Sequence, residues 1–328
     1  MTAGRTGARV AAMTDAHTKP AGQEDRPQRT YALGGHPVDA GRIAPGLHIV
    51  ATPIGNLGDI TLRALATLAA ADVIACEDTR VTRKLLDRYA IATPLTPYHD
   101  HNAATARPKL LRRLAEGAAI ALVSDAGTPL VSDPGYKLVR AAQEAGHAVT
   151  ALPGASSALA ALTVAGLPTD QFFFAGFLPP KQAARRARIV ELARIPATLV
   201  LFETGPRIAA TLADLATELG EREAAVCREL TKIHEEVRRG VIAALAQESA
   251  TREIRGEFVL VIAPPSAPER PSAGDADALL RQALARTSLK DAVGEVAVAT
   301  GLPRRELYQR ALVLAEEKNA EINDGAPR

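Results

Sequence analysis

The 328-residue sequence contains no tryptophan, only six phenylalanines and five tyrosines, and only two cysteines. With so few aromatic residues, any core is built from alanine, valine, leucine and isoleucine, and the 47% hydrophobic composition supplies enough of them. Cys76 and Cys227 lie far apart and form no CxxC pair, so the sequence indicates neither a disulfide framework nor a cysteine zinc site. Each ends an apolar run, which predicts buried, reduced thiols.

Two further absences concern membranes and nucleotides. No stretch approaches 18 consecutive apolar residues and the N-terminal region has no continuous apolar segment, so we expect a soluble, cytoplasmic protein without a membrane partner. The sequence has neither a GxGxxG motif nor a Walker A loop, which disfavours a nicotinamide dehydrogenase. The net charge of +2 is too small to indicate nucleic-acid binding by itself.

The order of apolar and polar segments predicts an α/β protein with two α/β domains and a small helical domain. Residues 1–45 are rich in Gly, Pro, Thr, Arg and Ala without apolar periodicity, which predicts a disordered tail. Short strands alternate with amphipathic helices over residues 46–166, as in a parallel, wound sheet. Residues 167–263 predict a second α/β domain with a mixed sheet. A Pro- and Ser-rich linker at 264–274 then leads to a helix–turn–helix-like domain at 275–320.

The most informative segment is Val123–Gly135, VSDAGTPLVSDPG. It follows a predicted strand, and Ser132-Asp133-Pro134 predicts the start of a helix, with a capping side chain beside a proline suited to the first turn. The loop carries Asp125 and Asp133 but no lysine or arginine. Because a phosphate loop needs bare N–H groups and a positive field, this loop instead favours a cationic or zwitterionic ligand.

Two other small-residue loops, Ala51–Asp59 (ATPIGNLGD) and Pro153–Ser157 (PGASS), also follow predicted strands and open helices. Each loop alone is typical of a simple strand-to-helix turn. Three such loops at the ends of three neighbouring parallel strands predict one shared crevice at the carboxyl edge of the sheet.

Five motifs together resemble the tetrapyrrole-methylase superfamily of class III S-adenosylmethionine-dependent methyltransferases: TPIGNLGDIT, EDTR, SDAGTPLVSDPG, LPGASS and LPTDQFFFAGFLP. Within it, the chain resembles the RsmI-type branch of 16S ribosomal RNA ribose 2′-O-methyltransferases. The resemblance runs from about Leu47 to Ile262 and continues in the C-terminal segment SLKDAV…TGLPRRELYQRAL. The porphyrin-acting branches have a GxGPGD-like first loop where this sequence has TPIGNLGD, which favours the RNA branch.

The resemblance implies that S-adenosylmethionine lies in a cleft between the two α/β domains. It also implies a homodimer that methylates the cytidine at position 1402 of 16S rRNA within the small ribosomal subunit. By position in the motifs, it implies cofactor contacts from Pro53, Asp125, Ala126, Gly127, Thr128, Val131, Ser156, Ser157 and Glu203. The acidic loop agrees with this, because the methionine ammonium and the sulfonium are both cationic.

Methyl transfer to a ribose requires that the hydroxyl is held in line with the methyl group and that its proton is accepted. The candidate catalytic residues are Asp78, Arg80, His99 and Lys232, with Glu77, Asp100, His101 and Glu229 as further options. Asp78 or Thr79 is equally expected to cap the helix that follows, and the histidines are equally expected to be solvated loop residues. No metal site is expected, because no cysteine accompanies the HxH pair.

Basic clusters on predicted helices supply the candidate RNA-binding residues: Arg83, Lys84, Lys181, Arg185 and Arg186. Taken alone, each cluster is more often a solvated helix face than a contact. For the C-terminal helix–turn–helix, a packing or dimerisation module is the alternative to nucleic-acid binding. A sequence-reading DNA role is disfavoured, because few basic residues lie on the second helix beyond Arg304, Arg305 and Arg310.

Two other functions stay open from the sequence. A tetrapyrrole (precorrin or uroporphyrinogen) C-methyltransferase would methylate its tetrapyrrole and never RNA. A non-enzymatic helix–turn–helix regulator that senses a small ligand would retain specific DNA without turnover.

Overall fold

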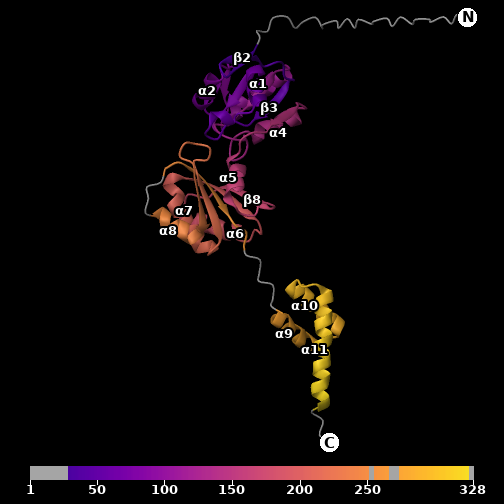
Figure 1. Cartoon of the computed structure of the whole chain (residues 1–328). Helices are drawn as coiled ribbons and strands as arrows, with labels where there is room; N and C mark the ends of the chain where they lie inside the picture. Colours follow the sequence, from indigo (N-terminus) through magenta and orange to yellow (C-terminus); the bar gives the residue numbers. More distant parts are fainter. Residues whose placement is uncertain (1–28, 251–254, 266–272, 325–328) are drawn as a thin grey trace, which may run out of the picture. The chain divides into compact units, whose positions relative to one another are not determined.

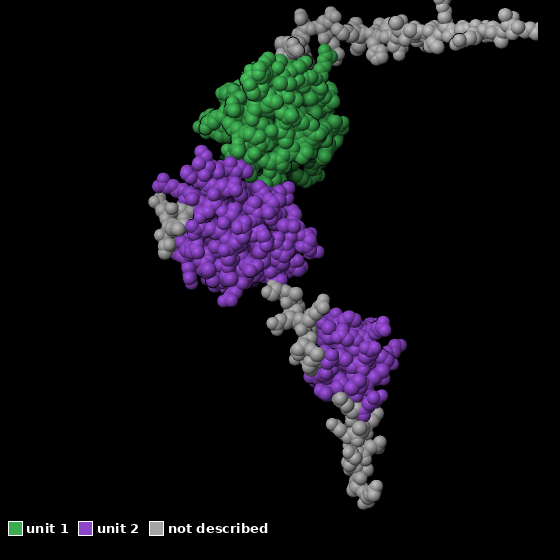
Figure 2. All heavy atoms as spheres, in the orientation of Figure 1, with its two compact units in different colours: residues 1–156 green, residues 157–328 purple. Residues whose placement is uncertain are grey.

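The computed structural model describes residues 29–250, 255–265 and 273–324, and Figure 1 shows its helices and strands. The chain divides by its contacts into two compact units, residues 1–156 and 157–328 (Figure 2). The greater part of the predicted tail and most of the predicted linker lie outside the described residues. Within the described part of the chain, no helix is both long and apolar enough to cross a membrane.

The first unit contains a five-stranded sheet with the strand order β5-β4-β6-β3-β7. Its strands are β3 (Gly46–Val50), β4 (Val73–Cys76), β5 (Leu95–Pro97), β6 (Ala119–Leu122) and β7 (Val149–Leu152). Every neighbouring pair is parallel, which confirms the predicted wound sheet. The strands β3, β4 and β6 are buried at every position, as expected for a parallel sheet covered on both faces.

Two separate apolar clusters cover the two faces of this sheet. One cluster includes residues of α1 (Leu62–Ala70) and α2 (Thr79–Arg88). The other includes residues of α3 (Ala103–Ala115) and α4 (Tyr136–Glu144). Each helix packs its apolar side against one face of the sheet, so helices cover both faces. The carboxyl edge of the strands is left for loops, and the small-residue loops lie there.

A β-hairpin precedes the sheet and corrects the prediction of a disordered tail up to residue 45. It consists of β1 (Thr30–Leu33) and β2 (His36–Asp39), paired antiparallel. Tyr31 is buried in the cluster that includes α1, and Arg29 forms an ion pair with Asp72, with 2.9 Å between Nη2 and Oδ1. These contacts join residues about 40 positions apart, so periodicity within the segment did not indicate them.

The second unit contains a mixed sheet with the order β11-β10-β12-β9-β8, as predicted for this part of the chain. Its strands are β8 (Phe172–Phe177), β9 (Thr198–Thr204), β10 (Glu223–Arg228), β11 (Glu236–Val241) and β12 (Glu257–Ile262). Only β8 and β9 are parallel to each other among these described strands. The helices are α5 (Ser157–Ala165), α6 (Gln182–Leu192), α7 (Gly205–Leu219) and α8 (Ile242–Ala250).

The boundary between the units lies ten residues before the predicted boundary at 166/167. The reason is α5, which packs against β10 and β12 of the second sheet.

The strand β11 and the helix α8 were not predicted. β11 has no fully buried position and carries two arginines, so its sequence lacks the apolar alternation of a half-buried strand.

The C-terminal region is a bundle of three helices, α9 (Ala273–Leu284), α10 (Leu289–Thr300) and α11 (Arg304–Asp324). Its own core includes Leu280, Val296 and Leu307. Ser288 caps α10 by accepting the Asp291 amide hydrogen at 3.2 Å, and Gly301 ends it with a left-handed φ of 68°. The predicted helix–turn–helix is therefore confirmed.

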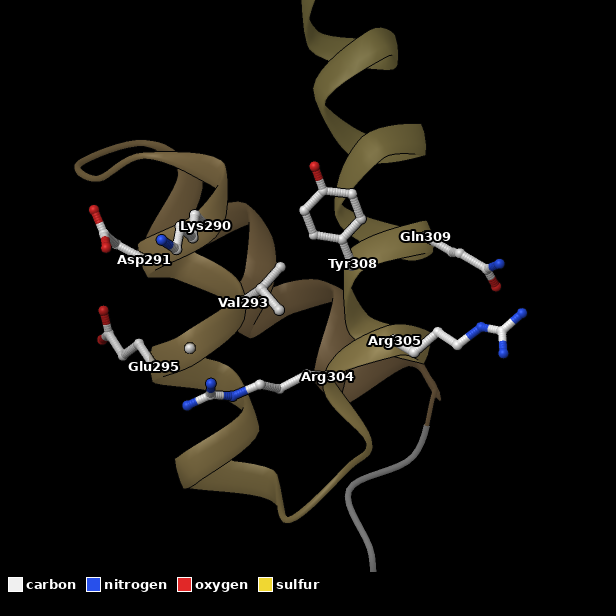
Figure 3. Close-up of a pocket in the computed structure, with 9 residues that line it drawn as sticks. Lys290, Asp291, Val293, Glu295, Arg304, Arg305, Tyr308 and Gln309 are labelled. Atoms are coloured by element: carbon white, nitrogen blue, oxygen red, sulfur yellow. The ribbon is translucent and has the colours of Figure 1, made fainter.

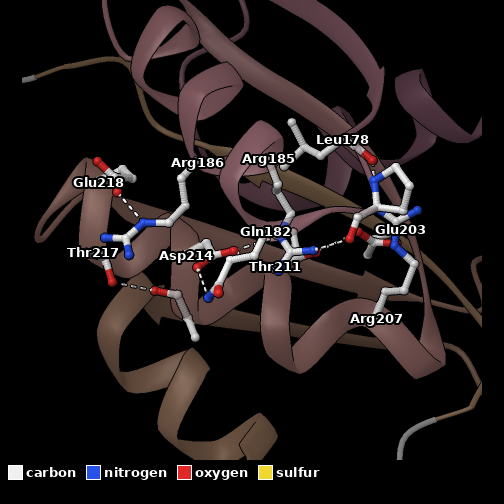
Figure 4. Close-up of polar contacts among 12 residues, drawn as sticks. Leu178, Gln182, Arg185, Arg186, Glu203, Arg207, Thr211, Asp214, Thr217 and Glu218 are labelled. Atoms are coloured by element: carbon white, nitrogen blue, oxygen red, sulfur yellow. Dashed lines mark hydrogen bonds and ion pairs between the residues drawn. The ribbon is translucent and has the colours of Figure 1, made fainter.

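Arg185, predicted to bind RNA, lies instead in the interior of the second unit. Its Nε donates to Asp214 Oδ2 at 2.7 Å, and its Nη1 donates to the carbonyl oxygen of Pro180 at 3.2 Å (Figure 4). The side chains of Arg185 and Asp214 are only 6% and 4% exposed. The ion pair joins α6 to α7, so the RNA-binding prediction for Arg185 is wrong.

We expect Asp214→Ala to lower the free energy of unfolding by about 3–5 kcal/mol, because it leaves the buried Arg185 guanidinium without its counter-charge. Urea denaturation of the full chain measures this change. The matched control is Glu191→Ala, which removes the exposed partner of Arg188 and is expected to cost less than about 1 kcal/mol. Equal effects of the two substitutions would contradict the structural role of Arg185.

Candidate active site

The loops after β3 and β6 are joined by a pair of backbone hydrogen bonds. The Thr52 amide donates to the Gly127 carbonyl at 2.8 Å, and the Gly127 amide donates to the Thr52 carbonyl at 3.0 Å. The hydroxyl of Thr128 then donates to the Ala155 carbonyl at 3.1 Å, which connects the loop after β7. Because β6, β3 and β7 are adjacent in the sheet, the three small-residue loops meet at one edge, as predicted.

Two glycines allow this close approach. Gly127 has φ +76°, and a Cβ there would lie 3.2 Å from Ile54 Cγ2. A Cβ on Gly154 would lie 2.9 Å from the Cβ of Ala51, closer than real Cβ atoms come. The first position needs glycine for its backbone conformation and the second for space. The sequence motifs contain both glycines but do not show which neighbour each one admits.

The loop after β6 is longer than predicted. α4 begins at Tyr136, and its N-cap is Gly135, with φ 136° and no side-chain cap. Leu130 and Ser132 have positive φ values of 73° and 63°, so the expected capping start at Ser132-Asp133-Pro134 is wrong. Positive φ at residues other than glycine costs free energy and is concentrated at functional sites. The conformation of residues 130–135 is therefore not that of a helix start, and the loop is stabilised by its hydrogen bonds to the neighbouring loops.

Several carboxylates lie close together in the loops that follow β4, β5 and β6. Asp125 Oδ1 accepts the Asp78 amide hydrogen at 3.0 Å, which connects the EDTR motif to the acidic loop. Burial raises the pKa of Glu77, and the carboxylates of Asp125, Asp133 and Asp100 raise it further. Burial and Asp125 also raise the pKa of Asp133, against the opposing effect of a hydrogen bond from Ser124. A cation bound here would relieve this repulsion.

Asp78 and Arg80 interact with each other. Arg80 Nη2 lies 2.6 Å from Asp78 Oδ2, and Asp78 caps α2 by accepting the Arg80 amide hydrogen at 2.8 Å. These hydrogen bonds lower the pKa of Asp78 from 3.8 to about 2. Asp78 therefore has the helix-capping role that was the alternative prediction, and its carboxylate is a weak proton acceptor.

His99 lies on the loop after β5, beside the loop that carries Glu77. The two loops are joined by a hydrogen bond of 2.7 Å from the Tyr98 amide to the Cys76 carbonyl. The His99 amide donates to Asn102 Oδ1 at 2.9 Å, while its ring Nδ1 is buried without a hydrogen-bond partner in the described chain. The structure thus brings the EDTR and YHDHN motifs together, and β5, a strand that was not predicted, positions the second motif.

Glu203 and Lys232, two of the candidates from the second unit, are both engaged in internal contacts. The side chain of Glu203 is fully buried; it accepts hydrogen bonds from the Thr211 hydroxyl at 2.7 Å and the Thr204 amide at 2.9 Å. Its carboxylate thus serves the fold, which argues against the predicted cofactor contact (Figure 4). Lys232 Nζ lies 2.9 Å from Glu229 and 2.8 Å from Glu257. Burial alone would lower the Lys232 pKa, but the hydrogen bonds that Lys232 donates to both carboxylates outweigh burial and raise the pKa.

The remaining predicted residues differ in accessibility. Ala126 and Val131 are exposed, Thr128, Ser156 and Ser157 are half-buried, and Pro53 is buried. Arg83, Lys84 and Lys181 are exposed on or beside helices, whereas Arg186 forms an ion pair of 2.6 Å with Glu218. Sequence reasoning missed Thr52 and Ala155, which connect the loops mainly through backbone atoms, and the Thr52 hydroxyl adds a hydrogen bond of 3.2 Å to the Ser124 carbonyl.

Residues 46–246 match the family of tetrapyrrole (corrin/porphyrin) methylases, which includes all three loops and more than half of the chain. The chain belongs to the tetrapyrrole methylase family. Residues 270–315, in the helical bundle, match the RsmI C-terminal HTH domain.

Curated relatives define the branch of the methylase family. A ribosomal RNA small subunit methyltransferase I from Mesorhizobium japonicum is 50% identical over 286 residues, 87% of this chain and 97% of the relative. The protein of the same name from Erythrobacter litoralis is 52% identical over 280 residues, 85% of this chain and 99% of the relative. A solved cobalt precorrin-4 methyltransferase shares the methylase fold, with a TM-score of 0.52 at 18% identity over 66% of this chain and 94% of its own.

We expect Glu77→Gln to raise the melting temperature at pH 7. The folded state raises the pKa of Glu77 above its unfolded value, so the charged carboxylate destabilises the fold at any pH above that raised pKa. The gain should shrink as the pH falls through the raised pKa and disappear at about pH 3, where glutamate is protonated in both states. Calorimetry at both pH values tests this, with Glu144→Gln on α4, an exposed partner of Arg140, as the control without a gain. A lower melting temperature for Glu77→Gln at pH 7 would contradict the repulsion.

Proposed function

We propose that the chain transfers a methyl group from S-adenosylmethionine to the ribose 2′-hydroxyl of a cytidine, at position 1402, in 16S ribosomal RNA. The observation that carries the proposal is the joined, acidic set of loops at the carboxyl edge of the parallel sheet. The identity of about one half to relatives named ribosomal RNA small subunit methyltransferase I supports RNA as the substrate.

The residues at this edge fit the proposed cofactor. Glu77, Asp125 and Asp133 provide negative charge for a ligand that carries an ammonium and a sulfonium. Gly127 supplies the positive φ and the space beside Ile54 that hold the loops in this arrangement. We therefore propose Pro53, residues 125–128, Val131, Ser156 and Ser157 as the cofactor-binding residues of this chain, and we leave out the buried Glu203.

When bound, S-adenosylmethionine supplies a methyl group that its sulfonium already activates for nucleophilic attack. The residues of this chain then orient the ribose hydroxyl and accept its proton. Asp78, with a pKa of about 2, and Lys232, held protonated by two carboxylates, are poorly matched to accept a proton near neutral pH. The proton acceptor that we propose is His99, whose ring Nδ1 is unpartnered among the described residues, with Glu77 as the alternative.

RNA would be held by the exposed cations. Arg83 and Lys84 lie on α2, the helix that begins at the EDTR motif, and Lys181 immediately precedes α6. Phosphate contacts from these residues make the affinity for RNA fall with rising salt. We further propose that the chain acts as a cytoplasmic homodimer on the small ribosomal subunit. The support for these last points is the resemblance to the rRNA-methylating branch.

The substrate is tested by incubating the purified chain with labelled S-adenosylmethionine and small ribosomal subunits from a strain that lacks this gene. We expect mass spectrometry of the 16S rRNA nucleosides to show one added 2′-O-methylated cytidine. Label on a precorrin or uroporphyrinogen, with none on RNA, would contradict the proposal. Specific retention of duplex DNA without any methyl transfer would identify a regulator instead.

We expect Gly127→Val to weaken binding of S-adenosylmethionine by at least about tenfold, because a side chain at this position crowds Ile54 in the joined loops. Isothermal titration calorimetry measures the change. The matched control is Gly117→Val. Gly117 has a similar φ of +82° but nothing within 4 Å of its Cβ position, so it carries the same backbone strain away from the loops. Equal weakening by both variants, or by neither, would show that the loop is only a turn.

A further inference from the structure

The helical bundle contains a groove that the proposed methyl transfer does not use. α10 and the first turns of α11 line a cavity of about 740 Å³ (Figure 3). Lys290 and Gly294 lie on the α10 side, and Arg304 and Tyr308 lie on the α11 side. In Figure 3 the Arg304 side chain extends toward α10, while the Arg305 side chain points away from α10.

The cations of this groove are available to a ligand, whereas its carboxylates are engaged. Among the described residues, no carboxylate pairs with Lys290, Arg304 or Arg305. The two acidic residues that line the groove have partners: Glu295 is paired with Arg286, and Asp291 accepts a hydrogen bond of 2.6 Å from the Ser288 hydroxyl. The groove therefore presents positive charge.

Arg310 does not line this groove. Its Nε lies 2.8 Å from Asp277 Oδ1, and its Nη2 donates to Asp277 Oδ2 at 2.8 Å. This bidentate pair joins α11 to α9 and serves the bundle. Of the three arginines on α11, Arg310 therefore has a structural role, whereas Arg304 and Arg305 are exposed and accessible to a ligand.

An aromatic ring and an amide stand beside the two arginines. Tyr308 follows Arg304 by four residues and Gln309 follows Arg305 by four residues, so each pair lies on one helical row. Tyr308 is 46% exposed, in a chain with only five tyrosines. Arginine forks bind phosphate in two-point contacts, and an exposed tyrosine ring stacks on an unpaired base. On the α10 side, a Cβ at Gly294 would meet nothing within 4 Å, so the groove is open there.

We propose that this groove binds single-stranded RNA, with phosphates at Lys290, Arg304 and Arg305 and a base stacked on Tyr308. Duplex DNA fits less well, because its bases are not free to stack and the exposed residues that follow on α11, Leu312 and Val313, are apolar. That the RNA is the ribosomal substrate rests on the proposed function. The bundle then adds affinity for the RNA that carries the methylated ribose.

The first test measures binding of the full chain to a fluorescent 12-nucleotide oligouridylate by anisotropy at several salt concentrations. We expect R304Q/R305Q to weaken binding by at least about tenfold, and its plot of log affinity against log salt to be less steep by about 1.4, or about 0.7 for each lost phosphate contact. R112Q/R140Q removes two exposed arginines from α3 and α4 and is expected to change binding less than about twofold. Equal effects of the two double variants would overturn the proposal.

The stacking partner and the groove are tested separately. Tyr308→Ala is expected to weaken oligouridylate binding by about fivefold or more, and Tyr308→Phe to retain it. Gly294→Glu places a carboxylate in the open groove and should abolish most of the binding, whereas Gly294→Ala should retain it and stabilise the helix. Retained binding in both Tyr308→Ala and Gly294→Glu, or tighter binding of a 12-base-pair DNA duplex by the unmodified chain, would overturn the assignment.

Methyl transfer to small ribosomal subunits separates this proposal from the proposed function. We expect R304Q/R305Q to raise the KM for subunits by at least about tenfold with little change in kcat, because the groove binds RNA without touching the reacting atoms. An unchanged KM would overturn the role of the groove while leaving the methyltransferase proposal intact. If the unmodified chain transferred no methyl group, the proposed function would fail, and the oligouridylate results would still decide the groove.

Discussion

The two hydrogen bonds between Thr52 and Gly127 determine the geometry of the candidate active site. They hold the loops after β3 and β6 together at the carboxyl edge of the sheet, and the Thr128 hydroxyl adds the loop after β7. Only then does Asp125 lie where it accepts the Asp78 amide hydrogen and links the loop after β4. A parallel sheet whose two faces are covered by helices leaves this edge free, so the fold and the site depend on the same arrangement.

Negative and positive charges lie on different parts of this chain, although the net charge is only +2. The loops of the first unit gather carboxylates, and burial together with their mutual repulsion raises the pKa of Glu77 and Asp133, which suits a cationic cofactor. Exposed arginines and lysines lie on α2 and in the groove of the bundle, which suits a polyanionic substrate. A methyltransferase that combines a sulfonium with RNA needs both kinds of surface. The charged carboxylates of the acidic loops lower the stability of the fold, and they supply the negative surface that suits the cofactor.

The sequence predicted the elements whose signal is local and missed those that depend on distant partners. The strand at 119–122 and the three glycine-containing loops were predicted because apolar runs and small residues mark them directly. The hairpin at 30–39 was missed because only Tyr31 of its residues is buried, against residues far along the chain. Likewise, nothing near Arg185 indicates that Asp214, 29 residues later, neutralises it. The start of α4 was misplaced because Ser132 adopts a positive φ that its sequence does not reveal.

The central claim is that the joined loops of the first unit bind the cofactor. A crystal structure of the full chain with S-adenosylhomocysteine, the product of the proposed transfer, tests it most directly. The account predicts that the amino-acid part of this ligand contacts residues 125–128, with the hydrogen bonds between Thr52 and Gly127 intact. A ligand bound away from the carboxyl edge of the parallel sheet, or loops that separate to admit it, would contradict the account.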